Sequence, residues 1–551
     1  MQALDSGLVI VTLSLSLVYA VAVTPLMAGY LLKRSAKPSA NGWVERLAVQ
    51  IGRLSVRRPI ATLLGVALVV AVSGSFATRV GFNFFPSSDR EQMVVSVALP
   101  EGTHLEATQL ASRKLERALT ARSDVKGVAA FVGRSAPRFY YNLPRDPQAP
   151  FLAQLVVTTS GPEQVGALQE FVRDFAAREL PDASVVPRRL EQGPPVAAPI
   201  EIRLFGEDLS ALHLASEDVQ RLLRHDRRAQ DVRADHGPGA PLLRFVTDDA
   251  AASRHGVSRA EVAAAIHGRT QGLDVGSYRA GIDPVPILLR APPAEDHTLQ
   301  ELEAIELTSA SIGRAVPVAG ITRKSLEFAP AVIHRIDRRR VASVLAQPRE
   351  GATYAAVLAD LEPKLEQLEL PAGVEYEIAG AAESSGDANQ GLGSKAPVAG
   401  ILLIAILLAQ FNSIRKVVIV LVTAPLAVLG IWPGLFLADL PFGFVALLGA
   451  IALIGIVVNG AIVLIDLTET RRREGVPLSE ALEAAVCVRT RPILLTTATT
   501  IAGLTPLLFS ESTLWPPMAS AMVSGLAIAT ALTLFAVPAL YRLLFREPTS
   551  T

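Results

Sequence analysis

Seven apolar runs, each long enough to cross a bilayer, constrain this chain more than any other feature. A helix of about 20 predominantly apolar residues spans the hydrocarbon core. The runs lie at about residues 8–32, 59–78, 396–411, 417–437, 441–465, 492–510 and 517–545. With 50% hydrophobic residues and a formal net charge of zero, the composition excludes an ordinary soluble protein and offers no basic surplus for nucleic acid. We therefore predict a multi-pass membrane protein without a nucleic-acid partner.

The basic residues of the short loops predict the orientation of these spans in the lipid bilayer. Those that follow the first, third, fifth and seventh spans include Lys33, Arg34, Lys416, Arg471, Arg472 and Arg542. The short loops at 438–441 and 510–517 have none, so the C-terminus is expected in the cytoplasm and the long segment 79–394 outside. Because no basic residue precedes the first span, which is long for a signal peptide, we interpret it as a permanent helix.

The outer segment contains a strand and helix pattern that occurs twice. The first copy runs from an alternating strand at 92–99 to a strand near 183–188, with the order βαββαβ that is typical of ferredoxin-like units. The second copy begins with "PIEIRLFG" at 199–206 and is completed at 332–380, after an insert. Two paired units with a cleft between them and a third, inserted domain are therefore expected.

Two pairs of residues at capping-box spacing predict where helices of the outer segment begin. Thr103 with Glu106 stands before the first helix of the first copy, and Ser258 with Glu261 stands before a helix of the insert. In each pair, the hydroxyl and the carboxylate are expected to bond the exposed N–H groups at the start of the helix.

Several stretches, taken in order, resemble one known family. They are "LSLSLVYAVAVTPLMAGYLL", "FFPSSDREQMVVSVALPEGTHLEAT", "GPPVAAPIEIRLFGEDL", "GAIALIGIVVNGAIVLID" and "RTRPILLTTATTIAGLTPLLF". Together they resemble the resistance-nodulation-division (RND) efflux permeases, in particular the hydrophobe and amphiphile exporters. The resemblance covers nearly the whole chain but only the C-terminal half of the family's usual chain.

The resemblance implies a fold class and a division into domains. The fold class is an α-helical membrane domain of about seven transmembrane helices plus an α+β periplasmic domain, which has two ferredoxin-like βαββαβ porter units and an inserted docking-type domain. The expected domains are two transmembrane helices with a basic connector at 1–78, a first porter subdomain at 79–195, a split second one at 196–231 and 332–390, the docking-type insert at 232–331, and five transmembrane helices at 391–551.

The resemblance also implies a function: a trimeric efflux pump of a bacterial inner membrane, which works by proton antiport and is not an enzyme. Small hydrophobic substrates would pass from the porter clefts to an outer-membrane channel through a periplasmic adaptor. No cofactor is expected. In this family protonation occurs on acidic residues of the fourth helix, which belongs to the N-terminal permease half, so that half is an expected partner in the same or a separate chain.

Proton-relay candidates lie on the tenth and eleventh helices of the resemblance. Asn459 and Asp466 are seven residues apart in "GIVVNGAIVLID" and so lie near one helix face. The family's relay threonine and arginine match Thr496 and Arg489, whereas its lysine matches Val458. This difference suggests Asn459 as a neutral hydrogen-bond partner. The alternative for Asn459 and Thr496 is helix packing, and for Asp466 it is an interfacial charge.

The centres of the seven predicted spans contain no Asp, Glu, His or Lys, although a proton carrier needs a titratable group. Two hypotheses follow. In the first, a companion half supplies the carboxylates. In the second, the chain is a transport-inactive truncated remnant, or a membrane-anchored periplasmic protein that acts as a binding, sensor or assembly protein.

The resemblance places the aromatic segment 132–151 beside the substrate cleft, where ring faces can receive varied apolar guests. The substrate-cleft candidates are Phe131, Arg138, Phe139, Tyr140 and Tyr141. The alternative is an ordinary loop whose aromatic rings pack on the sheet.

A metal site is not predicted. Soft metals favour methionine and cysteine ligands, but Met93 is the only methionine of the outer segment and Cys487 is the only cysteine. His225 and His236 occur in "HDRRAQDVRADH" among aspartates, a pattern more typical of a solvated helix end and turn.

Overall fold

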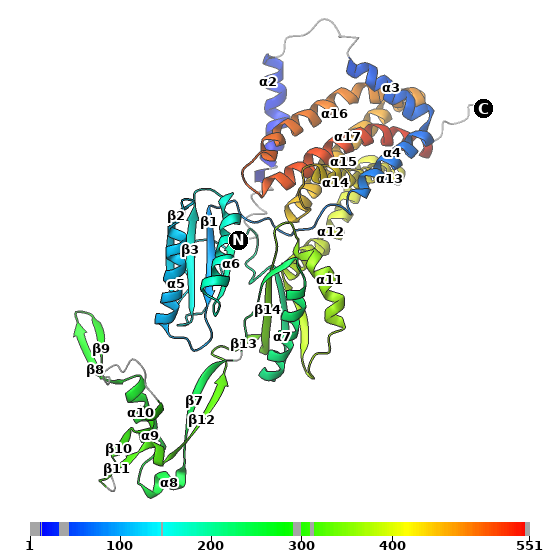
Figure 1. The fold of residues 1–551 in the computed structure, drawn as a ribbon. Helices are drawn as coiled ribbons and strands as arrows, with labels where there is room; N and C mark the ends of the chain where they lie inside the picture. The colour runs from blue at the N-terminus through cyan, green and yellow to red at the C-terminus, as the bar shows by residue number, and fades with distance from the viewer. Residues whose placement is uncertain are drawn as a thin grey trace.

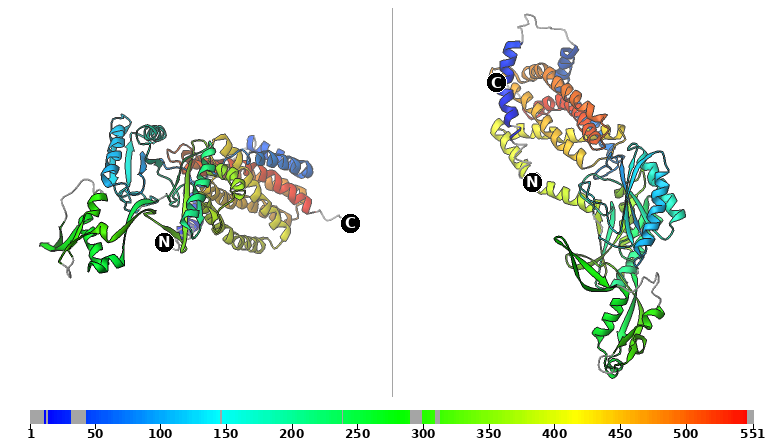
Figure 2. Two further views of the ribbon diagram at one scale, coloured as in Figure 1. Left: turned by 60° about the horizontal axis from the view of Figure 1, so that its bottom comes forward. Right: turned by 90° about the vertical axis from the view of Figure 1, so that its left-hand side faces the viewer.

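The computed structural model describes residues 11–12, 14–31, 43–144, 147–237, 239–289, 299–308 and 313–545. A bundle of helices forms one end of the molecule, and two units of strands and helices adjoin it (Figure 1). The insert extends beyond them, farthest from the bundle, as two further views also show (Figure 2).

The first outer unit is a four-stranded antiparallel sheet with two helices. Its elements are β1 (Gln92–Ala98), α5 (Leu105–Thr120), β2 (Val125–Val132), β3 (Leu152–Thr159), α6 (Gln164–Glu179) and β4 (Ser184–Arg189). The strand order is β2-β3-β1-β4, and Val95 pairs with Leu155 across the two central strands. Leu115 of α5 and Leu168 of α6 are fully buried against this sheet. The alternating apolar residues of β1 and β3 thus face the helices and form the core.

The second outer unit repeats this arrangement around an interruption of the chain. Its elements are β5 (Ile200–Phe205), α7 (Leu209–His225), β6 (Ala229–Ala234), β13 (His334–Ile336), β14 (Arg339–Pro348), α11 (Tyr354–Glu366) and β15 (Glu375–Gly380). The sheet has the order β13-β14-β5-β15, and β6 also pairs with β14. Since β6 continues to Ala234, the domain boundary predicted after residue 231 falls inside this strand.

The insert is a small domain on a two-stranded stem. Its elements are β7 (Ala240–Thr247), α8 (Asp249–Arg254), α9 (Arg259–Thr270), β8 (Leu273–Ala280), β9 (Asp283–Leu289), α10 (Leu299–Glu303), β10 (Glu306–Thr308), β11 (Ala315–Pro317), a 3-10 turn (Val318–Gly320) and β12 (Thr322–Ala329). Strands β7 and β12 pair antiparallel as the stem, and β8 with β9 forms an exposed hairpin. Val262, Val318 and Ile321 are buried in its small core.

One of the two predicted capping boxes forms. Ser258 accepts a hydrogen bond from the Glu261 N–H, and the Glu261 carboxylate accepts one from the Ser258 N–H. The prediction at Thr103 is wrong, because α5 begins at Leu105 after His104 and has no side-chain cap. The Thr103 hydroxyl instead donates to the Pro100 carbonyl at 2.6 Å within the preceding turn.

The described residues place helical structure at each of the seven predicted spans. The helices are a π-helix (Tyr19–Val23), α2 (Thr24–Leu31), α3 (Trp43–Arg57), α4 (Pro59–Ser75), α12 (Ala381–Phe411), α13 (Ile414–Leu429), α14 (Ile431–Leu437), α15 (Phe444–Arg473), α16 (Leu478–Leu508) and α17 (Trp515–Leu544). By length and composition, 4 helical segments of the described chain can cross a membrane, or up to 5 if the bent pair α3–α4 is one span. Seven crossings therefore remain a prediction.

Helix α17 lies at the centre of the bundle, against α13, α15 and α16. Small residues allow this close approach. An added Cβ at Gly525 would clash with Leu453 of α15, and one at Gly434 would clash with Ser524. The first of these contacts sets the approach of α17 to α15, two of the three helices that enclose the cavity described next.

Candidate functional site

A cavity of about 240 Å³ lies between α15, α16 and α17. We call it the membrane cavity. The polar residues that line it are Asn459 of α15, Arg489, Thr496, Thr497 and Thr500 of α16, and Thr530 and Thr533 of α17. The rest of the wall is apolar, with Val463, Ile493 and Leu526 among its members. Polar groups that face a shared space in an otherwise apolar bundle are typical of ion and proton pathways.

The structure brings together three of the four relay candidates. Asn459, Arg489 and Thr496 all line the membrane cavity. Asp466 does not line it and is exposed on α15, seven residues closer to the C-terminal end of that helix. Val458, at the position of the family's lysine, is buried in the bundle core with 4% exposure. The amide of Asn459 therefore lines the cavity, whereas the side chain of Val458 does not.

Hydroxyl groups of the membrane cavity bond mainly within their own helices. Thr496 donates to the Pro492 carbonyl at 3.0 Å, and Thr500 donates to the Thr496 carbonyl at 2.9 Å. The hydroxyls of Thr497 and Thr530 lie 2.9 Å apart and join α16 to α17. Helix packing therefore accounts for part of this threonine cluster.

Two polar atoms of the membrane cavity have no partner among the described residues: Nε of Arg489 and Oγ1 of Thr533, both buried. A buried donor without an acceptor costs free energy, and a guanidinium normally pairs with a carboxylate. The cavity thus has unused hydrogen-bonding capacity next to a positive charge.

Sequence reasoning missed the residues that α17 contributes. Thr530 and Thr533 stand three residues apart in "ATALT" within an apolar run, a helical spacing that places both on one face. That spacing was a usable signal. Which neighbouring helix they face, however, depends on the packing of the bundle.

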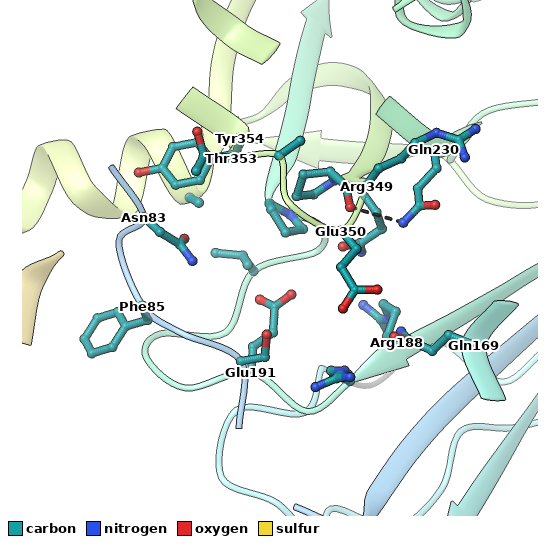
Figure 3. A pocket seen from close by; sticks show the side chains of 18 of the residues that line it. Asn83, Phe85, Gln169, Arg188, Glu191, Gln230, Arg349, Glu350, Thr353 and Tyr354 are labelled. Carbon is teal, nitrogen blue, oxygen red and sulfur yellow. Dashed lines mark hydrogen bonds between the residues drawn. The ribbon is translucent and has the colours of Figure 1, made fainter. Parts of the chain in front are cut away.

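A second cavity, of about 480 Å³, lies between the two outer units (Figure 3). We call it the interdomain cavity. Its walls come from the segment that follows α4, from α6 and β4 of the first unit, and from β6, β14 and the start of α11 in the second. Glu191 and Glu350 extend their side chains into this space (Figure 3). Burial raises the pKa of the Glu191 carboxyl, and the positive charge of Arg188 opposes part of this shift.

An ion pair links the two units at the rim of the interdomain cavity. The Arg173 guanidinium of α6 donates two hydrogen bonds to the Asp231 carboxylate of β6, the shorter at 3.0 Å. Gln230 donates to the Pro348 carbonyl at 3.1 Å, the bond drawn in Figure 3. Only the ion pair crosses between the units and holds the second unit against α6, since Gln230 and Pro348 both belong to the second unit.

The substrate-cleft candidates lie on the first unit, and none lines either of the two cavities. Phe131 is part of β2 and pairs with Gln154, and Phe139 is exposed. Tyr140 packs against Val94 of β1 and against Leu143 and Leu190 outside the strands.

The remaining two candidates form hydrogen bonds with each other and with the segment that follows β4. The Arg138 guanidinium donates to the Tyr141 carbonyl, and the Tyr141 hydroxyl accepts a bond from the Gly193 N–H at 2.8 Å. This packing corresponds to the ordinary-loop alternative. A cleft role for the five candidates stays a prediction.

The histidine-rich turn forms part of the second unit. His236 lies edge-on to His213 with ring centroids 6.1 Å apart, while Nδ1 of His225 bonds the Arg221 carbonyl within α7. Within the described ranges, no group of three or more His, Cys, Asp or Glu side chains is arranged to hold a metal ion. Met93 has 0% exposure in the core of the first unit.

The fold and its cavities define an RND-type permease: a helical bundle that carries two outer α/β units, the second interrupted by an insert. A sequence profile described as the AcrB/AcrD/AcrF family matches residues 6–545. The chain belongs to this family, whose members are efflux transporters rather than chemical catalysts. The family is found in the inner membrane with a periplasmic domain.

Individual relatives are similar at low identity. The "Cation efflux system protein CzcA" of Alcaligenes sp. (strain CT14) is 24% identical over 529 residues, which are 92% of this chain and 49% of the relative. The "Multidrug resistance protein MdtC" of Klebsiella pneumoniae (strain 342) is 24% identical over 555 residues, 96% of this chain and 52% of the relative. The chain thus spans about half the length of the curated relatives it matches.

A solved structure has the same fold. The crystal structure of a heavy metal efflux pump (crystal form II) superposes with a TM-score of 0.78 at 24% identity, and the match covers 91% of this chain and 51% of that one.

Proposed function

We propose that this chain forms the C-terminal half of a proton-driven efflux permease in a bacterial inner membrane. In this proposal, the two outer units are ferredoxin-like porter subdomains and the insert is a docking-type domain. The half length relative to CzcA and MdtC supports the proposal. So does the membrane cavity, because polar residues line it and none of the described lining residues is a carboxylate.

The observation that carries the proposal is the pair of buried, unpartnered atoms in the membrane cavity, Nε of Arg489 and Oγ1 of Thr533. A carboxylate from the N-terminal half would accept hydrogen bonds from both. When that carboxylate takes up a proton, it loses its charge and its strong attraction to the guanidinium. Protonation would then change how the two halves pack, which is the step that couples proton flow to transport.

In this proposal, Asn459 is a neutral hydrogen-bond partner of that carboxylate. The family's usual lysine would stand one position earlier, at Val458. An amide can donate to an ionised carboxylate and accept from a protonated one. Since an amide does not itself titrate, the proton in this mechanism is carried by the companion half alone.

Export would follow the route of the family: uptake through the porter region, passage along the docking domain, and release through a periplasmic adaptor and an outer-membrane channel, with three copies assembled. The interdomain cavity between the two outer units is our candidate for part of the uptake route, because it is open and formed by both units.

Small hydrophobic compounds are the first candidate substrates. The burial of Met93 favours them, since a methionine in a sheet core cannot bind a passing soft metal. Metal cations are the second candidate, which the names of CzcA and of the heavy metal efflux pump favour. Cation ligands would then come from oxygen groups such as those of Glu191 and Glu350.

An accumulation assay in the source cells tests the proposal. Cells in which the chain is deleted should accumulate more of a hydrophobic dye, or of a divalent metal ion, than cells that express it. A protonophore should abolish this difference. Arg489→Met should behave like the deletion, whereas Arg254→Met, at an exposed arginine of α8, should behave like the unmodified chain. Equal accumulation of every probe with and without the chain would overturn the proposal and favour a binding or sensor protein.

A further inference from the structure

Helix α3 lies at the end of the bundle remote from the outer units (Figure 1). One face of α3 packs on α16 and α17 and contains the buried residues Ala48, Ile51, Gly52, Ser55 and Val56. The opposite face has no covering element in the described chain and carries two kinds of side chain.

Apolar and basic residues form two adjacent stripes on this open face. Trp43, Leu47 and Leu54 are 73%, 37% and 48% exposed, and their spacings of four and seven residues place them on one line along the helix. The second stripe consists of the exposed residues Arg46, Arg53 and Arg57, which are spaced by seven and four residues. At 3.6 residues per turn, the two stripes lie side by side.

Acidic residues neutralise little of the basic stripe. Glu45 lies about 100° from Arg46 around the helix, so it is not on the line of the basic stripe. Arg57 lies 4.0 Å from Glu483 but keeps 73% of its side chain exposed. Arg46 and Arg53 are exposed beside the apolar stripe, and neither forms an ion pair with a carboxylate of the described residues.

The direction of α3 follows from the next helix. The chain bends by 109° between α3 and α4. Helix α4 exposes Ile60, Leu64 and Leu68, a stripe at helical spacing that is typical of a lipid-facing span. If α4 crosses the bilayer near its normal, α3 runs close to the plane of the membrane surface.

We propose that the open face of α3 is a binding surface for anionic phospholipids of the cytoplasmic leaflet. The apolar stripe enters the boundary between headgroups and acyl chains, and the arginine stripe binds the phosphate groups next to it. The guanidinium is suited to this ligand, since it bonds phosphate oxygens in a bidentate way. This surface does not depend on proton coupling or on substrate, so it stands apart from the proposed function.

Quenching of Trp43 fluorescence by brominated lipids tests the proposal. The other two tryptophans, Trp432 and Trp515, are replaced by phenylalanine, which leaves Trp43 as the only reporter. The full chain is reconstituted in vesicles of phosphatidylcholine and phosphatidylglycerol, with bromine on one lipid or the other. We expect phosphatidylglycerol to quench with about fivefold preference, roughly the effect of one arginine near an anionic surface, and the preference should fall at high salt.

Two variants that each remove two positive charges distinguish binding at α3 from a general effect of basic residues. Arg46→Gln with Arg53→Gln should abolish the preference, while both lipids still quench Trp43. Arg471→Gln with Arg473→Gln, at exposed positions of α15, should leave the preference intact. The proposal is overturned if neither lipid quenches Trp43, if the unmodified stripe shows no preference, or if the α3 variant keeps it.

Discussion

Removing the ion pair between Arg173 and Asp231 should loosen the junction of the two outer units. The carboxylate is 8% exposed and the guanidinium 22% exposed, with an N–O distance of 3.0 Å. Asp231 also has a backbone φ of 54°, in β6 opposite a register shift of β14. Its side chain thus ties an irregular part of β6 to α6 of the first unit.

The burial of the pair sets the size of the effect. Exposed ion pairs contribute about 0–1 kcal/mol, whereas removing one partner of a buried pair costs about 3–5 kcal/mol. Because the carboxylate is nearly buried but the guanidinium is not, we expect Arg173→Gln to cost about 2 kcal/mol. That free energy corresponds to a rise of about 30-fold in the opening equilibrium of β6.

Hydrogen exchange of peptides from β6, measured by mass spectrometry on the full chain, provides the assay. A double-mutant cycle combines Arg173→Gln with Asp231→Asn, since asparagine tolerates the positive φ. The coupling free energy should be at least about 1 kcal/mol. Arg244→Gln is the control, because its pair with Glu327 is 55% and 45% exposed. Unchanged β6 exchange in the single variants, or strictly additive effects, would refute the reasoning.

Three further predictions concern other sites. Glu191→Gln should stabilise the outer units at neutral pH but not at low pH. Burial raises the folded-state pKa of the Glu191 carboxyl, so the unmodified protein loses stability as the pH rises through that pKa. Thermal unfolding at two pH values checks this prediction. Gly525→Val should lower the yield of folded protein in detergent gel filtration, because a side chain there clashes with Leu453, whereas Gly503→Val, with open space around it, should not. Asn459→Leu with Thr496→Val should reduce proton-coupled efflux several-fold; unchanged efflux would assign both to packing.

The apolar runs predicted the positions of the membrane helices but not their ends. Helix α12 begins at Ala381 and α16 at Leu478, about fifteen residues before the runs predicted at 396 and 492. The length of an apolar run reflects the thickness of the bilayer. A helix can continue beyond it with polar turns, so hydropathy alone cannot locate its first residue.

The membrane cavity was partly predictable, whereas the interdomain cavity was not. Helical spacing and the family resemblance identified Asn459, Arg489 and Thr496, and these three line one cavity. The walls of the interdomain cavity come from segments near residues 85, 190 and 350. Only the packing of two separately folded sheets brings these segments together, and the local sequence pattern carries no signal for it.

Proton flux through the purified complex tests the central claim most directly. The chain, tagged and purified from its own membranes with whatever first half accompanies it, is reconstituted in vesicles that contain a pH-sensitive dye. Our account predicts that substrate drives proton movement with the unmodified chain, that Arg489→Met abolishes it, and that the chain stripped of its companion half moves no protons. Proton movement by the isolated chain, or full coupling in the Arg489→Met complex, would contradict a relay that the two halves complete together.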